Sequence, residues 1–96
     1  MNIQEAGELV ESFLRDELLE DPYFEQTEDG EEVPKLSLQH VDTRPDAIDI
    51  LFMVENEGDE NEPDVKALAE RALNALKAKH PEVFKYKITH KIWPPP

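Results

Sequence analysis

The sequence contains no cysteine, which excludes a disulfide framework, a thiolate nucleophile and a zinc site built on cysteine ligands. Its three glycines stand alone at positions 7, 30 and 58, so no glycine-rich loop is present to hold a phosphate group. No apolar run approaches the roughly 20 residues of a membrane-spanning helix, and residues 1–20 carry acidic groups where a signal peptide begins with basic ones. We therefore expect a soluble chain that is synthesised in the cytosol and binds no membrane.

Basic residues are scarce in the first two-thirds of the chain. Residues 1–64 hold 21 acidic and only three basic side chains, whereas residues 65–96 hold seven basic and two acidic ones. The net charge of −13 is thus divided between an acidic pole and a mildly basic pole. One explanation for this division is selection for solubility. The alternative is that the acidic part imitates nucleic acid or binds a basic surface on a partner. Direct binding to nucleic acid is disfavoured, because the phosphates would repel most of the surface.

Two segments have the spacing of amphipathic helices. In the first, which begins after Asn2 and ends before Pro22, apolar residues recur every three or four positions. Asn2 is a favourable N-cap, and Glu5 lies where its side chain reaches back to that cap. The second helix is predicted over Pro63–Lys79, with acidic residues at its start and basic residues at its end, as the helix dipole favours.

The stretch from Asp46 to Val54 is the most apolar in the chain and has apolar residues on both faces of an extended strand. Such a strand is typical of the centre of a sheet or of a strand that a partner covers. Residues 33–41 alternate as a half-buried strand, which places His40 on the buried face and Val41 on the other. Residues 42–45 then supply the turn of a hairpin, and the alternation of apolar and polar residues over 83–93 predicts the last strand.

The order helix, strand, strand, helix, strand predicts one α+β domain over residues 1–93, followed by a proline tail at residues 94–96. We expect two layers, with both helices on one face of a three-stranded, mainly antiparallel sheet.

The sheet face away from the helices would have no cover within the chain. On it Leu51, Met53 and Trp93 exceed the usual scatter of exposed apolar side chains, which indicates a protein interface. A solvated face whose lysines prevent edge pairing is the alternative, and stacking on single-stranded nucleic acid is the least favoured use. The predicted partner-binding residues are Val41, Asp49, Leu51, Met53, Lys85, Lys87, Lys91 and Trp93.

The sequence offers little for catalysis or for a cofactor, and we expect neither. His40 and His90 could be neighbours across the sheet and, with Asp42 or Asp49, bind a metal. Strand histidines that are partly buried and hydrogen-bonded to other protein groups are commoner than metal ligands. The serines have no adjacent base, and the acidic loops lack the twelve-residue calcium-binding pattern. The densest acidic loop predicts an acidic surface formed by Glu55, Glu57, Asp59, Glu60 and Glu62.

The order of elements resembles that of the tail-terminator proteins of long-tailed phages, small proteins that form a ring where the tail tube meets the head. The segments that carry this resemblance are Val33–Leu38, Asp46–Val54, Pro63–Lys79 and Phe84–Trp93. The resemblance implies a non-enzymatic virion protein of the tail or neck that binds copies of itself or neighbouring virion proteins. Independently, the acidic and basic poles favour a head-to-tail contact, which can close a ring.

An acidic inhibitor is the alternative hypothesis. Such a phage-encoded protein displays carboxylates at phosphate-like spacing and occupies the basic cleft of a host DNA-binding or defence enzyme. Glu5, Glu8, Glu11 and Asp16 on the first helix, together with residues 55–64, would supply the carboxylates. The basic C-terminal third weakens the imitation. Adaptation to high salt would explain the acidity without any partner, but the lysines argue against it.

Overall fold

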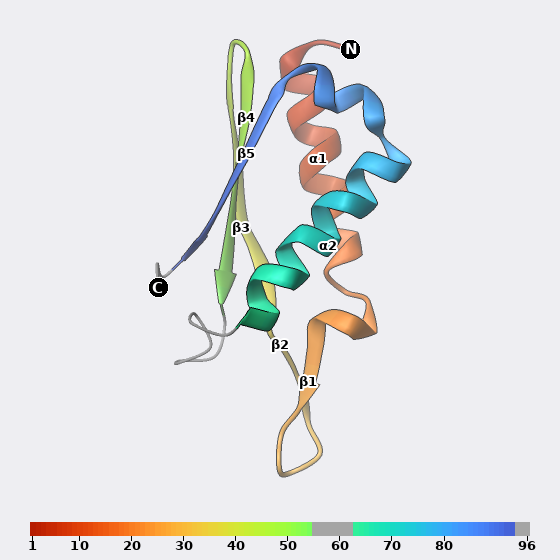
Figure 1. Cartoon of the computed structure of the whole chain (residues 1–96), viewed down its shortest axis with the longest axis vertical. Helices are drawn as coiled ribbons and strands as arrows, with labels where there is room; N and C mark the ends of the chain where they lie inside the picture. The colour runs from red at the N-terminus through yellow and green to blue at the C-terminus, as the bar shows by residue number, and fades with distance from the viewer. Residues whose placement is uncertain (55–62, 94–96) are drawn as a thin grey trace.

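The computed structural model describes residues 1–54 and 63–93. A three-stranded sheet is covered on one face by two helices, and a short hairpin extends from one end of the molecule (Figure 1). The elements are α1 (Ile3–Glu17), η1 (Asp21–Tyr23), β1 (Phe24–Gln26), β2 (Glu32–Pro34), β3 (Leu36–Arg44), β4 (Ala47–Val54), α2 (Pro63–Lys79), η3 (Pro81–Lys85) and β5 (Lys87–Trp93). The two-layer α+β fold is confirmed. The predicted acidic surface at Glu55, Glu57, Asp59, Glu60 and Glu62 and the proline tail lie outside the described residues.

Helix α1 begins as its capping residues predict. The side chain of Asn2 accepts a hydrogen bond from the Glu5 backbone N–H at 2.8 Å, and Glu5 Oε1 accepts one from the Asn2 backbone N–H at 3.3 Å. The apolar stripe of α1 is buried against the sheet. Gly7 lets the helix approach closely, because a Cβ at this position would overlap the methyl group of Thr43 on β3. Neither described helix is both long and apolar enough to cross a membrane.

Strand β4 lies at the centre of the sheet, between β3 and β5. A two-residue turn at Pro45 and Asp46 joins β3 to β4, so this pair is antiparallel. Helix α2 separates β4 from β5 and carries the chain back over the sheet, so β5 pairs with β4 in parallel and the sheet is mixed. The covered face of β4 forms the middle of the core, since Ile48, Ile50 and Phe52 are at most 2% exposed.

A β-bulge at Gln39 changes which face the second half of β3 presents. Leu38 pairs with Phe52 and His40 pairs with Leu51, so Gln39 is an extra residue without a partner on β4. An extra residue reverses the alternation of every side chain that follows it. Val41 therefore lies opposite Ile50 and packs against the core, while His40 lies on the uncovered face. The predictions that Val41 lies on the uncovered face and His40 on the covered face are wrong.

The last strand begins later than its alternating pattern predicts. Pro81 starts the 3₁₀ turn η3, which buries Val83, and β5 begins only at Lys87. The Lys85 ammonium donates a hydrogen bond to the backbone carbonyl of Met1 at 2.9 Å, and the Tyr86 hydroxyl donates to the same oxygen at 3.1 Å. Lys85 therefore fastens the N-terminus to η3, and its predicted place on the uncovered sheet face is wrong.

The polar segment between α1 and β3 contains the short hairpin formed by β1 and β2. Gly30 makes its turn with a φ of 84°, a left-handed conformation that glycine adopts without strain. Tyr23, just before β1, is buried, and its hydroxyl donates a hydrogen bond to the Glu17 carboxylate at 2.6 Å. Burial and this carboxylate raise the pKa of the Tyr23 hydroxyl above its usual range. The tyrosine thus anchors the hairpin to the end of α1.

Candidate functional site: the open face of the sheet

We call the sheet surface that faces away from α1 and α2 the open face. Cross-strand partners share a face of a sheet, so the register of the three strands defines which residues belong to it. These residues are Ser37, His40, Asp42, Arg44, Ala47, Asp49, Leu51, Met53, Lys87, Thr89, Lys91 and Trp93. Both helices lie on the other side of the sheet (Figure 1), so neither of them covers the open face.

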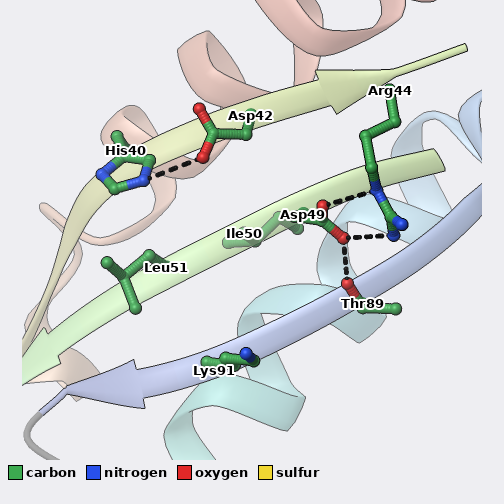
Figure 2. A pocket seen from close by; sticks show the side chains of 8 residues that line it. All are labelled: His40, Asp42, Arg44, Asp49, Ile50, Leu51, Thr89 and Lys91. Carbon is green, nitrogen blue, oxygen red and sulfur yellow. Dashed lines mark hydrogen bonds and ion pairs between the residues drawn. The ribbon is translucent and has the colours of Figure 1, made fainter.

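The end of the open face nearest the β3–β4 turn is organised around Asp49. Arg44 Nε and Nη2 donate to the two carboxylate oxygens of Asp49 at 2.9 and 3.1 Å, and the Thr89 hydroxyl donates to one of them (Figure 2). Asp49 therefore connects all three strands. The Thr89 hydrogen bond, followed by the bonds and charge of Arg44 and the charge of Lys91, holds the pKa of Asp49 below its usual range.

Asp42 lies directly opposite Asp49, which brings two like charges together across the strands. Arg44 neutralises Asp49 on one side, and the His40 ring nitrogen Nε2 lies 3.1 Å from Asp42 Oδ2 on the other (Figure 2). The His40 and Asp42 side chains remain 48% and 70% exposed. This polar end is therefore satisfied internally through two adjacent pairs, of which Arg44–Asp49 joins β3 to β4 and His40–Asp42 lies within β3.

The middle of the open face is hollowed. A depression of about 480 Å³ is lined by residues of all three strands, including Arg44, Asp49, Leu51 and Lys91. A second depression of about 380 Å³ continues along β5 and is lined by Leu51, Lys91, Ile92 and Trp93. Leu51 and Lys91 line both depressions, so the two form one shallow trough that runs from the polar end of the face to Trp93.

The far end of the open face is apolar. Leu51 and Met53 are half-buried, and Trp93, which pairs with Met53 in the β4–β5 ladder, is 55% exposed. Among the described residues, Trp93 is one of three exposed large hydrophobic side chains, with Met1 and Leu19. The open face therefore combines this apolar end with a polar end whose charged groups are bonded to one another.

The lysines of β5 supply the free charge of the open face. Lys87 and Lys91 are both exposed, and neither forms an ion pair with any of the described residues. Arg44 is already bound to Asp49, whereas these two lysines have no ion-pair partner among the described residues. They also lie on an edge strand, where lysine discourages pairing with the edge of another sheet.

The polar side chains of the open face are bonded to one another. A carboxylate with a lowered pKa, as in Asp49, is a weak proton acceptor near neutral pH. The Thr89 hydroxyl donates to Asp49, so its proton is directed away from His40. His40 and His90 are not neighbours, because β4 separates their strands and His90 lies on the covered side, where its ring meets the edge of Phe52. Within residues 1–54 and 63–93, no three histidine or carboxylate side chains lie close enough together to hold a metal ion.

Six of the eight predicted partner-binding residues lie together on the open face: Asp49, Leu51, Met53, Lys87, Lys91 and Trp93. Val41 and Lys85 lie elsewhere. Sequence reasoning missed four residues that line the trough, namely His40, Asp42, Arg44 and Thr89. Thr89 could have been found from its position between Lys87 and Lys91. His40, Asp42 and Arg44 on β3 could not have been found, because the residue types around Gln39 do not indicate a bulge.

Comparison of the chain with protein-family models, with curated proteins and with solved structures gave no significant match.

Proposed function

We propose that this chain is a non-enzymatic protein–protein interaction module whose open face binds another protein molecule. The observation that carries the proposal is the position of Trp93 beside Leu51 and Met53 on a sheet face that the helices leave uncovered. With 55% of its surface exposed, Trp93 offers roughly 100 Å² of additional burial, which is worth about 3 kcal/mol to association. Tryptophan is also the residue type most enriched among energetically dominant interface contacts.

The internal bonding of the polar end supports binding rather than catalysis. Asp49, Arg44 and Thr89 satisfy one another, so they need no ligand to complete them. A rigid, pre-organised surface of this kind lowers the entropic cost of docking a partner. An enzyme site requires instead a nucleophile or base held free to react. We therefore propose that the trough receives side chains of a protein partner and that no reaction takes place in it.

We further propose that the protein assembles into a ring in the tail or neck of a phage particle. The order of its elements resembles that of tail-terminator proteins, and a chain with separate acidic and basic surfaces is suited to head-to-tail contacts. In this proposal the partner is a copy of the same chain or a neighbouring virion protein. The protein would pass from the cytoplasm, where it is made, into the virion.

Light scattering coupled to size-exclusion chromatography tests the proposal, with Leu51→Asp and Met53→Asp as the informative variants. Each replaces an apolar side chain of the open face by a charged one, so association should be lost while the fold is kept, because both side chains already lie half in solvent. Ala67→Asp, on the exposed side of α2, is the matched control and should assemble like the unaltered protein. Assembly that survives both Leu51→Asp and Met53→Asp would show that the open face is not the interface.

The acidic inhibitor predicts a different outcome in the same experiment. A protein that imitates nucleic acid would remain a monomer at low and high salt and would bind a basic DNA-binding enzyme through its carboxylates. Leu51→Asp would then leave its binding unchanged, because the open face would take no part. That result would replace the assembly proposal with the inhibitor.

A further inference from the structure

The acidic outer surface of α1 has a complement on the open face of the same protein. We propose that α1 of a second copy binds along β5, with Glu8 near Lys87, Asp16 near Lys91 and Leu19 against Trp93 at the apolar end. This inference rests on the proposed function and adds the identity of the surface that fills the trough.

Helix α1 presents carboxylates that the fold leaves unused. It carries five acidic residues and one basic residue, and this one, Arg15, already forms an ion pair with Glu11 at 3.0 Å. Glu8 and Asp16 are exposed and take part in no ion pair with the described residues. Just beyond the helix, Leu19 is 71% exposed, the highest value among the large hydrophobic side chains of the described chain.

These three side chains lie on one side of α1. At about 100° per residue, Asp16 is about 80° from Glu8 around the helix axis. The Leu19 backbone N–H donates to Asp16 O at 3.2 Å, a bond of the 3₁₀ type with three residues per turn, so Leu19 lies one turn beyond Asp16 and on the same side of the helix. Along the axis Glu8 and Asp16 are about 12 Å apart, and Leu19 follows about 6 Å further on.

Strand β5 offers the matching series. Lys87 and Lys91 lie four residues apart on the same face, a separation of about 13 Å, and Trp93 follows about 7 Å further on. Two cations and then an apolar side chain therefore face two anions and then an apolar side chain at nearly the same spacing. In this register Glu8 meets Lys87, Asp16 meets Lys91 and Leu19 meets Trp93, which fixes the direction of α1 along β5.

The contact must join different molecules. Helix α1 covers one side of the sheet and the open face is the other side (Figure 1), so the two surfaces of one chain point in opposite directions. Each copy would use its open face toward one neighbour and α1 toward another. Such heterologous contacts repeat until a ring closes or a filament grows. Two open faces packed together would instead bring the lysines of both copies into one interface, which like-charge repulsion disfavours.

Charge reversal tests this pairing. The face-reversed variant carries Lys87→Glu and Lys91→Glu, and the helix-reversed variant carries Glu8→Lys and Asp16→Lys. All four positions are exposed, and circular dichroism and thermal melting check that each variant keeps the fold. Matched controls with the same charge changes are Lys77→Glu with Lys79→Glu on α2, and Glu28→Lys with Asp29→Lys in the hairpin turn.

Analytical ultracentrifugation should show that each reversed variant alone sediments as a monomer and that both controls assemble like the unaltered protein. An equimolar mixture of the two reversed variants should assemble again, because each reversed surface then meets its opposite on the other variant. High salt should weaken assembly of the unaltered protein, since it screens exposed ion pairs.

Assembly of the helix-reversed variant alone, with the face-reversed variant monomeric, would overturn the role of α1 and leave the open face as the interface. A mixture that stays monomeric would overturn the pairing as well. An unaltered protein that is monomeric at every concentration would overturn self-assembly. If the face-reversed variant and Leu51→Asp both assemble normally, the proposed function itself falls.

Discussion

The bulge at Gln39 predicts different stabilities for two single-residue deletions, one of Gln39 and one of Ser37. Deleting Gln39 removes the unpaired residue and leaves every observed pair in place, with Leu38 still opposite Phe52 and His40 still opposite Leu51. Deleting Ser37 also gives a strand without a bulge, but it moves Leu38 opposite Met53 and Gln39 opposite Phe52. The second deletion therefore turns a leucine outward and a glutamine inward, whereas the first does not.

The size of the difference follows from burial. Leu38 is only 8% exposed, so moving it to the open face costs about 2 kcal/mol of burial. Placing the Gln39 amide on the covered face without a hydrogen-bond partner costs about 1–3 kcal/mol more. Both deletions remove the bulge, so the effect of its loss on the free energy of unfolding cancels when the two variants are compared. The Ser37 deletion should therefore be less stable than the Gln39 deletion by about 3–5 kcal/mol, a large part of the stability of a small domain.

Urea denaturation followed by circular dichroism measures this difference directly. The Gln39 deletion should unfold cooperatively with a midpoint near that of the unaltered protein. The Ser37 deletion should have a midpoint lower by one or more molar units, given a slope of about 1–3 kcal/mol/M for a small protein. Two deletions of equal stability would show that the register of β3 is not what keeps Leu38 in the core, and the correction for Val41 and His40 would lose its basis.

Two further predictions concern α1 and the polar end of the open face. Gly7→Ala should destabilise the protein by about 1 kcal/mol in thermal melts, because the clash with the Thr43 methyl group outweighs the gain in helix propensity. Adding Thr43→Ser should recover most of that loss, and a Gly7→Ala variant more stable than the original would contradict the close packing of α1 on β3. Because folding lowers the pKa of Asp49, this carboxylate stabilises the fold above the pKa of the unfolded chain, near 3.9, and the contribution is lost as pH falls through the lower folded value. The stability difference between the unaltered protein and Asp49→Asn should accordingly shrink between pH 6 and pH 2.5 in urea titrations, and a constant difference would show that Arg44 and Thr89 do not favour the charged form.

Much of the architecture could be predicted because its signals are local and agree with one another. The capping pair Asn2 and Glu5 begins α1 where expected, and the alternation around Ile50 identifies the central strand and its covered face. The register of β4 and β5 then places Asp49, Leu51, Lys91 and Trp93 on one surface, as their spacing predicts. In each case the apolar period fixes the result, since a shift of one residue would expose the core.

The errors occurred where tertiary packing overrides the local pattern. The segment around Gln39 alternates without interruption in the sequence, and only the fit of β3 under α1 determines where the extra residue is placed. Residues 83–86 also alternate like a strand, but Pro81 and the burial of Val83 favour a 3₁₀ turn. The Asp49 network could not be predicted for the same reason, because Arg44 reaches it only after the bulge has turned that side chain to the open face.

The chain contains a single tryptophan, and it lies in the surface proposed to bind a partner, so its fluorescence reports directly on that surface. The decisive measurement is acrylamide quenching of Trp93 as protein concentration rises through the range in which light scattering detects assembly. The account predicts that quenching falls and the emission maximum moves to shorter wavelength as oligomers form. Oligomers that leave Trp93 as accessible as it is in the dilute protein would contradict it.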